Sequence, residues 1–258
     1  MTNPNGTPIW YELISADPDA SKAFYDHVIG WTIGAPMSAD FDYRMIAIGD
    51  DSTGGLMRLT PEMAASGAKP TWLFYIGVDD VDATITKLVA KGGVVVMPAW
   101  DMPGVGRMAF VTDPQGNPFY VMKGATDGTS TAFDRMGMGK CNWNELITSD
   151  QVAGNAFYGD VFGWTYPGSM TMPGDMGEYV FVAVGEVGIG ATMKVSGDAK
   201  PGWRFYFRTP DIDATAAKVG EAGGKVLQGP HEVPGGDRII VATDVHGVVF
   251  GAVGPGGG

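Results

Sequence analysis

The dominant feature of this sequence is a long internal repeat. The segment Trp10–Ile14 returns as Trp143–Ile147 at an offset of 133 residues, and Trp72–Tyr75 returns in part as Trp203–Tyr206 at an offset of 131. A repeat that extends over most of a chain indicates tandem duplication of one ancestral unit, and it constrains the architecture before any single residue is interpreted. Each candidate residue can therefore be compared with its copy in the other half.

Each half divides again into two similar parts. Ile9–Ile14 is a short apolar and aromatic segment typical of a strand, and Asp17-Pro18 supplies a helix cap followed by proline at the first helical position. An apolar stripe follows at helical spacing, and Gly30 is expected to end the helix. Three further strands complete a βαβββ module. The pattern predicts an α+β fold of four such modules, at roughly residues 8–60, 70–123, 140–196 and 201–253.

The module boundaries suggest two domains, residues 1–125 and 141–258. Between them, residues 126–140 are rich in Gly, Ser and Thr and are expected to form a linker. The Gly-rich tail 254–258 is expected to be disordered. At 258 residues the chain is long enough for each half to bury its own core.

Composition narrows the partners and the compartment. The net charge of −12 disfavours nucleic acid and anionic membranes, because both repel an acidic surface. The single Cys141 fits a reducing compartment, and the N-terminal residues lack the basic and apolar segments of a secretory signal. Apolar runs are too short to cross a bilayer. The expectation is a soluble cytoplasmic protein, monomer or homodimer, whose partner is a small molecule.

The repeated motifs resemble the vicinal oxygen chelate superfamily, which includes glyoxalase I, bleomycin-resistance proteins and extradiol dioxygenases. The resemblance rests on Asp17, Phe24-Tyr25 and Gly30-Trp31, on the turn Asp113–Gly116, and on their copies. It is narrower for fused two-domain glyoxalase-like proteins, a group that includes the mycobacterial 27 kDa antigen. The resemblance implies two glyoxalase-like domains with cupped mixed sheets, and a ligand on the concave faces. Which modules share a cup stays open.

The resemblance also implies where a metal would bind, since metal enzymes of this superfamily take His, Gln or Glu ligands from the first and last strands of their modules. Divalent metals need nitrogen, oxygen or sulfur donors at those places. Arg204 would repel a cation, and the three histidines do not recur between the halves. The sequence therefore predicts no metal and no other cofactor. The positions concerned are Trp10, Met57, Leu73, Tyr120, Trp143, Met193, Arg204 and Gly251.

Aromatic side chains take the place of the metal ligands. Because side chains alternate along a strand, Trp10 and Glu12 share one face, as do Trp143 and Glu145. Glu12 and Glu145 are the candidate catalytic bases, since a carboxylate beside an indole loses hydration and gains basicity. The candidate ligand-binding residues are Trp10, Leu73, Tyr75, Arg107, Tyr120, Trp143, Arg204, Tyr206 and Arg238.

Two functions fit these residues. One is a metal-free protein that binds a small aromatic or amphiphilic molecule in an aromatic-lined cup; the other is a metal-independent lyase, isomerase or hydroxylase-like enzyme. A metal-dependent glyoxalase or dioxygenase is a weaker alternative. Purely structural roles are the alternative to both functions. The tryptophans can fill space in the core, the glutamates can make buried hydrogen bonds, and Arg107 and Arg238 can form structural salt bridges.

The two cups need not be equivalent. Tyr120 and Gly251 occupy one repeat position, so the cup with Gly251 is expected to be the larger and the better binding site. If modules one and four share a cup, it also holds Trp10, Glu12 and Arg204, a set suited to an anionic aromatic ligand.

Overall fold

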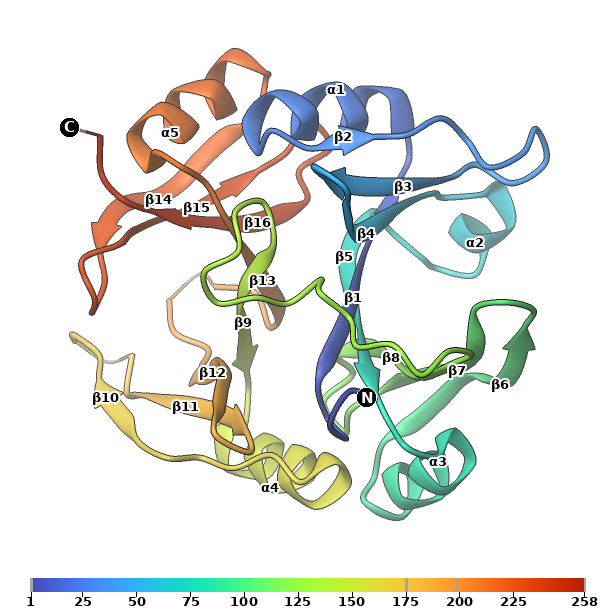
Figure 1. Cartoon of the computed structure of the whole chain (residues 1–258). Coiled ribbons are helices and arrows are strands. Elements are labelled where there is room, and N and C mark those ends of the chain that lie inside the picture. The colour runs from blue at the N-terminus through green and yellow to red at the C-terminus, as the bar shows by residue number, and fades with distance from the viewer. Residues whose placement is uncertain (1, 175, 198, 258) are drawn as a thin grey trace. The chain divides into compact units, whose positions relative to one another are not determined.

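The computed structural model describes residues 2–174, 176–197 and 199–257, and it contains the four predicted βαβββ modules (Figure 1). Module one consists of β1 (Pro8–Ser15), α1 (Pro18–Val28), β2 (Thr32–Ile33), β3 (Tyr43–Ile48) and β4 (Asp51–Arg58). After the short α2 (Pro61–Ala65), module two consists of β5 (Thr71–Gly77), α3 (Val81–Ala90), β6 (Val94–Met102), β7 (Gly106–Thr112) and β8 (Pro118–Gly124).

The second half repeats this order. Module three consists of β9 (Cys141–Thr148), α4 (Gln151–Phe162), β10 (Ser169–Thr171), β11 (Glu178–Val184) and β12 (Val187–Lys194). Module four consists of β13 (Gly202–Arg208), α5 (Ile212–Glu221), β14 (Lys225–Glu232), β15 (Arg238–Thr243) and β16 (Val249–Gly254). The predicted α+β architecture is confirmed.

The helices begin where the sequence indicates. The carboxylate of Asp17 accepts hydrogen bonds from two backbone amides of the first turn of α1, and Pro18 occupies the first helical position. The helical spacing of apolar residues predicts a buried stripe of Ala20, Ala23, Phe24 and Val28. Phe24 and Val28 are buried, whereas Ala23 is exposed and Tyr25 is buried, so the buried face is shifted toward Tyr25.

The strands form two eight-stranded mixed sheets. Their strand orders are β2-β3-β4-β1-β5-β8-β7-β6 and β10-β11-β12-β9-β13-β16-β15-β14. Modules one and two thus contribute to one sheet, and modules three and four contribute to the other. As a consequence, Arg204 on β13 belongs to the same sheet as Trp143 and not to the sheet of Trp10.

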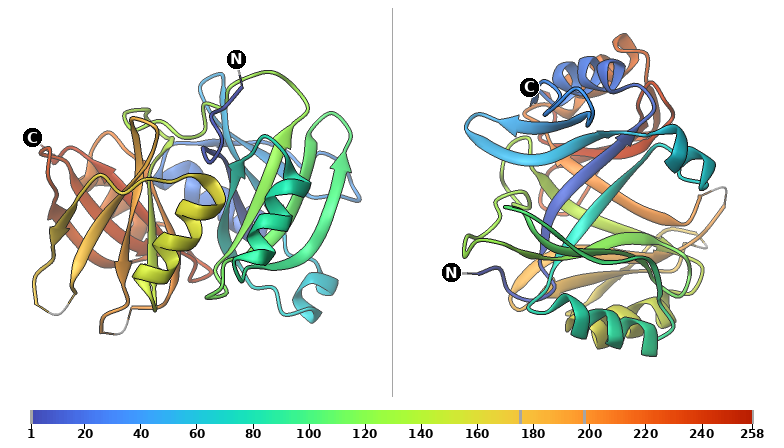
Figure 2. Two further views of the ribbon diagram at one scale, coloured as in Figure 1. Left: turned by 90° about the horizontal axis from the view of Figure 1, so that it is seen from below. Right: turned by 90° about the vertical axis from the view of Figure 1, so that its right-hand side faces the viewer.

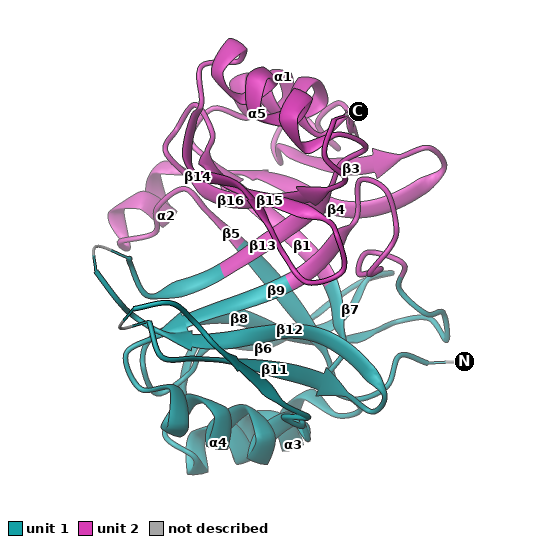
Figure 3. Cartoon of the chain, turned by 90° about the vertical axis from the view of Figure 1, so that its left-hand side faces the viewer, with its two compact units in different colours: residues 1–9, 73–130, 144–203 teal, residues 10–72, 131–143, 204–258 magenta. Residues whose placement is uncertain are grey.

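The two compact units of the chain do not coincide with the two sheets. One compact unit contains residues 1–9, 73–130 and 144–203, and the other contains residues 10–72, 131–143 and 204–258 (Figure 3). The first unit, called unit 1, packs α3 beside α4, and unit 2 packs α1 beside α5 (Figure 2). Each unit combines a module from each half, whereas the domain boundaries at 125 and 141 follow the repeat and remain a prediction.

A buried Tyr–Asp–Trp cluster ties the two modules of unit 2 together. The Tyr25 hydroxyl donates to Asp244 at 3.3 Å and accepts from the Trp72 indole at 2.9 Å. Asp244 also accepts from the backbone amides of His246 and Val248 in its own turn. Burial raises the pKa of Tyr25 and also that of Asp244. The repeated Tyr and Asp of the sequence motifs are therefore structural partners.

Unit 1 contains the equivalent cluster. The Tyr158 hydroxyl lies 3.1 Å from the Asp113 carboxylate, and the Trp203 indole donates to that hydroxyl at 3.3 Å. Asp113 additionally accepts a hydrogen bond from the side chain of Asn117 at 2.7 Å. The equivalent residue in unit 2 is Val248, whose side chain cannot make this bond. Burial raises the pKa of Tyr158 as well.

Two expectations about irregular segments need correction. The tail is not disordered over residues 254–257: Gly254 belongs to β16, Pro255 accepts from the amide of Ile212, and Gly257 donates to Asp213. Gly258 lies outside the described residues. Helix α2 was also not predicted, because it is too short to leave a periodic pattern. None of the described helices combines the length and apolarity needed to cross a membrane.

Candidate ligand-binding site

The faces of β1 follow the predicted alternation. Tyr11 is buried against Phe205 and Phe207 of unit 2, with ring centroids 5.3 and 6.3 Å away. Trp10 and Glu12 therefore lie on the opposite face of β1. Trp10 is half-buried there, and Glu12 is almost completely buried.

The indole of Trp10 is held by a tyrosine from β3. Trp10 Nε1 donates to the Tyr43 hydroxyl at 2.9 Å, and the Tyr43 ring stacks on Phe41 with a centroid separation of 5.9 Å. The Tyr43 hydroxyl lies directly over Gly55, where a Cβ atom would approach it to 2.0 Å. Gly55 is the register partner of Glu12 on the neighbouring β4. This position of Tyr43 therefore requires glycine at residue 55.

In module three the equivalent tyrosine makes a different contact. Tyr179 donates from its hydroxyl to the Glu145 carboxylate at 3.0 Å. The register partner of Glu145 on β12 is Ala191, which replaces the glycine of module one. Since a methyl group occupies the space over the strand, Tyr179 cannot take the position of Tyr43. A phenol hydrogen-bonded to a buried carboxylate is an arrangement that can transfer a proton.

Trp143 has aromatic, aliphatic and cationic neighbours within unit 2. Its half-buried ring packs against the cluster of Tyr206, Val241 and Val253. The guanidinium carbon of Arg135 lies 5.4 Å from the centre of the Trp143 ring, within the range of a cation–π contact. The nearby Cys141 thiol donates to the Trp143 carbonyl, and burial raises its pKa to about 12, so it is not a nucleophile.

The Tyr120–Gly251 difference changes how a neighbouring tyrosine packs. In unit 1, Tyr75 stacks on Tyr120 with centroids 4.3 Å apart and ring planes 10° apart. In unit 2, Tyr206 occupies the equivalent strand position, and its ring lies over Gly251, where a Cβ atom would approach the ring to 2.2 Å. The space left by glycine is thus filled by Tyr206. The prediction of a larger cup accordingly requires this ring to move.

The remaining predicted residues are placed as follows. Leu73 is buried on β5, and Arg204 is half-buried near the start of β13. Arg107 forms ion pairs with Asp82 at 2.8 Å and with Asp101 at 3.0 Å. Arg238 repeats the first of these pairs with Asp213 at 2.5 Å. The arginines therefore join a strand to the helix of the same module, and their partners are aspartates rather than the repeated glutamates.

The side chains at the superfamily's metal-ligand places do not fit a divalent metal. Indole, aliphatic and thioether side chains offer a hard cation no suitable donor, and the guanidinium of Arg135 beside Trp143 would repel it. Among the described residues, no three His, Cys, Asp or Glu side chains gather closely enough to hold a metal ion. The chemistry considered below therefore uses no metal.

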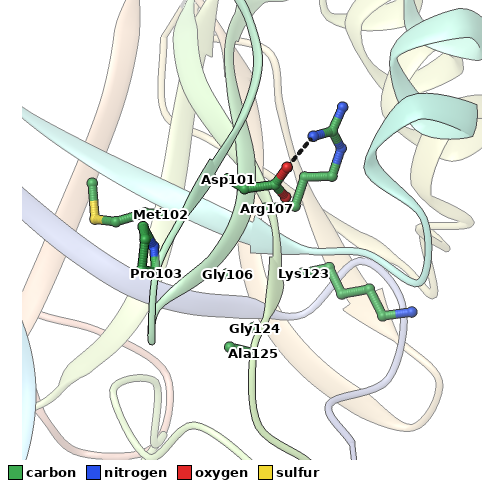
Figure 4. A pocket seen from close by; sticks show the side chains of 8 residues that line it. All are labelled: Asp101, Met102, Pro103, Gly106, Arg107, Lys123, Gly124 and Ala125. Atoms are coloured by element: carbon green, nitrogen blue, oxygen red, sulfur yellow. Dashed lines mark hydrogen bonds and ion pairs between the residues drawn. The ribbon is translucent and has the colours of Figure 1, made fainter.

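An open cavity of about 320 Å³ lies at the β6–β7 hairpin and the end of β8 (Figure 4). It is lined by Asp101, Met102, Pro103, Gly106, Arg107, Lys123, Gly124 and Ala125. On one wall of the cavity, the charged groups of Arg107 and Asp101 are paired with each other. The glycine-containing loop between β6 and β7 thus forms the rim of a shallow hollow in unit 1.

Three residues that contact the candidate side chains were missed in the sequence. Tyr43 on β3 is the register partner of Met57 on β4, and Tyr179 holds the corresponding place on β11, next to the Val180–Thr192 pair. The offset between the two tyrosines is 136 residues and not 133. A comparison at constant offset therefore overlooks them. Arg135 was assigned to the linker, where no structural partner was expected.

These features define a duplicated α+β fold built from four βαβββ modules. The chain belongs to the glyoxalase/bleomycin resistance protein/dioxygenase superfamily, whose family model matches residues 8–121 and 140–251. It is similar to CFP32 of Mycobacterium bovis, a protein described provisionally as a glyoxylase, with 34% identity over 97% of this chain and 95% of that protein. It is also similar to the anthracycline biosynthesis protein DnrV of Streptomyces peucetius, with 30% identity over 96% and 93% of the two chains.

Solved structures share the fold at low identity. The 2,3-dioxygenase LapB from Pseudomonas sp. KL28 matches with a TM-score of 0.68 and 13% identity, covering 98% of this chain and 94% of that one. A Mn(II)-bound glyoxalase from Novosphingobium aromaticivorans matches with a TM-score of 0.65 and 18% identity, covering 98% and 83%. These matches extend over both halves of the chain and concern the fold alone.

Proposed function

We propose that this protein binds a planar aromatic small molecule without a metal ion, at the surface formed by Trp143 and Tyr206 in unit 2. The observation that carries the proposal is the packing of the half-buried Trp143 ring against Tyr206, Val241 and Val253, at a strand position from which metal enzymes of the superfamily take a ligand. Tryptophan and tyrosine provide large contact areas with few rotatable bonds, which favours flat ligands.

Tyr206 gives this surface a way to admit a ligand. Its ring covers Gly251, and a glycine leaves open space on the strand once the ring rotates away. The equivalent Tyr75 ring is stacked on Tyr120, so its movement would open no comparable space. The similarity to DnrV, named for anthracycline biosynthesis, supports a polycyclic aromatic compound as the ligand class.

A second candidate function is metal-independent proton transfer by Glu145. The contact from the Tyr179 hydroxyl to this buried carboxylate at 3.0 Å favours it. The carboxylate would remove a proton from a carbon next to a carbonyl group, and the electron pair of that bond would move to the carbonyl oxygen as an enolate forms. Returning the proton to the opposite face of the same carbon, as the carbonyl group re-forms, would complete an epimerisation in which all atoms and electrons balance.

Binding is tested by titration of EDTA-treated protein with hydroxyanthraquinones, naphthoates and aliphatic acids, while tryptophan fluorescence is recorded. The proposal expects saturable quenching by the polycyclic compounds, unchanged by added Mn²⁺, Zn²⁺ or Fe²⁺. Trp143→Leu should abolish the effect, whereas Trp10→Leu should retain it. Quenching that requires added metal would refute the proposal.

Proton transfer is tested separately by exchange of carbon-bound deuterium in any ligand found by that titration. Glu145→Gln should stop the exchange and leave the affinity within about twofold, since it removes the base but keeps the side-chain volume. Glu12→Gln is the matched variant from module one and should leave the exchange rate unchanged. Exchange at the wild-type rate in Glu145→Gln would exclude this second function.

A further inference from the structure

The loop that precedes β9 places a guanidinium beside Trp143. Asn142 is buried, and its side-chain amide donates to the carbonyl of Asp134 at 2.9 Å and also to the carbonyl of Arg135. The amide of Asp134 in turn donates to the carbonyl of Cys141 at 3.0 Å. These bonds fix the backbone from which the Arg135 side chain extends over the Trp143 ring.

Among the described residues, Arg135 differs from five other arginines in that no aspartate neutralises its charge. Arg44, Arg58, Arg107, Arg208 and Arg238 each contact an aspartate within 4 Å. In the part of the chain that the structure describes, the exposed Arg135 guanidinium forms no ion pair with a carboxylate, and it lies beside the Trp143 ring. An arginine stacked on an aromatic ring can still donate in its own plane, which suits a carboxylate.

The first copy of the repeat lacks this arrangement. The residue 133 positions before Arg135 is Thr2, and the indole of Trp10 is engaged by the neutral phenol of Tyr43. A cation beside the indole is therefore a property of the second copy. In a chain of net charge −12, most of the surface repels an anionic ligand, whereas the exposed Arg135 guanidinium provides a positive charge beside an aromatic ring.

We propose that Arg135 selects the ligand by binding a carboxylate on the edge of its aromatic ring system, so that the ligand class is a planar aromatic carboxylate. This inference rests on the proposed binding function and adds the charge of the ligand to it. It replaces Arg204, the residue expected from the sequence, as the main anion-binding group.

The test uses two probes of the same shape, anthraquinone-2-carboxylate and anthraquinone-2-carboxamide, titrated by calorimetry into the wild type and into Arg135→Gln. The wild type should bind the carboxylate roughly tenfold to a hundredfold more tightly than the amide, the range for a hydrogen bond to a charged group. Arg135→Gln should remove this preference and leave affinity for the amide within about twofold. Arg135→Lys should restore only part of it, because a lysine lacks the planar pair of donors.

Lys69→Gln is the matched control, since it removes one exposed positive charge from unit 2 far along the chain from Arg135. It should bind both probes like the wild type. If the wild type binds the amide as tightly as the carboxylate, or if Arg135→Gln weakens both probes equally, the charge assignment is wrong and aromatic binding survives. If the wild type binds neither probe, aromatic binding itself fails and the assignment of Arg135 fails with it.

Discussion

Trp10–Glu12 and its copy Trp143–Glu145 have the same register with the neighbouring strand, but the tyrosines beside them form different hydrogen bonds. In module one, Tyr43 lies over Gly55 and accepts from Trp10; in module three, Tyr179 donates to Glu145, opposite Ala191. Gly55 and Ala191, the two residues at this position, differ by one methyl group. We infer that this methyl group keeps Tyr179 from taking the position that Tyr43 has over Gly55.

The comparison extends to the other modules. Tyr75 has a second tyrosine beneath its ring, whereas Tyr206 has Gly251. Glycine at residue 251 does not leave an empty position, because the Tyr206 ring lies over it. The two copies therefore differ in the arrangement of aromatic side chains on the same strand pairing.

The largest expected effect concerns the close approach of β12 to β9. A Cβ atom at Gly190 would lie 1.8 Å from the carbonyl oxygen of Asn144, and one at the equivalent Gly54 would lie 2.5 Å from that of Tyr11. Since backbone atoms cannot rotate away, Gly190→Ala should lower the free energy of unfolding by about 3 kcal/mol or more, and Gly54→Ala by about 1–3 kcal/mol. Urea denaturation measures both. Equal losses would show that the strands of the two halves are equally close.

The Tyr–Asp clusters predict a pH dependence for unit 2. Burial raises the pKa of Asp244 in the folded state, so the folded chain binds more protons than the unfolded chain. The free energy of unfolding should therefore contain a term that falls as the pH rises from the ordinary aspartate pKa, about 3.9, through the raised value. Asp244→Asn lacks this term.

The measurement is the stability of Asp244→Asn relative to the wild type, obtained from urea denaturation at a series of pH values. The variant should gain stability relative to the wild type as the pH rises through that window. A relative stability that stays constant or falls would mean that the Asp244 carboxylate is not penalised by burial.

The exchange of Gly55 and Ala191 tests the role of the single methyl group. Gly55→Ala should displace the Tyr43 hydroxyl, break its bond with Trp10 and lower the free energy of unfolding by about 1 kcal/mol. Only the mobile end of the ring must shift, so the fold should persist. Ala191→Gly is the reciprocal variant and should allow Tyr179 to leave Glu145. A crystal structure of each variant would reveal the tyrosine positions, and unchanged positions would disprove the steric explanation.

The smallest effects are expected for the repeated strand–helix ion pairs. Arg107→Ala and Arg238→Ala should each lower the free energy of unfolding by less than about 1 kcal/mol, because the aspartate partners are exposed and screened by water. Thermal denaturation at low and high salt measures this. A loss of several kcal/mol at either residue would indicate that the pair does more than join a helix to a strand.

The sequence predicts the fold more completely than the site. The repeat and helix caps such as Asp17-Pro18 are local signals, and they correctly indicate four βαβββ modules. The environment of Trp10 depends on Tyr43, which lies on another strand after a loop of different length in each copy. Contacts that cross between strands are fixed by tertiary packing, and no spacing in the sequence encodes them.

Arg135 illustrates the same limit in a loop. Its segment has the composition of a linker, yet the side chain of Asn142 holds it beside Trp143. The prediction that the metal-ligand places lack suitable donors, in contrast, rests on residue types alone, because the donor chemistry of Trp10 and Trp143 does not depend on geometry.

The most direct test of the account is the stoichiometry of ligand binding in the EDTA-treated protein. Calorimetric titration with anthraquinone-2-carboxylate should give one equivalent per chain, because among the described residues an arginine lies beside the tryptophan of the second copy and not beside that of the first. Trp143→Leu should abolish this binding and Trp10→Leu should preserve it. Two equivalents per chain, equal losses in the two variants, or binding that depends on added divalent metal would contradict the account.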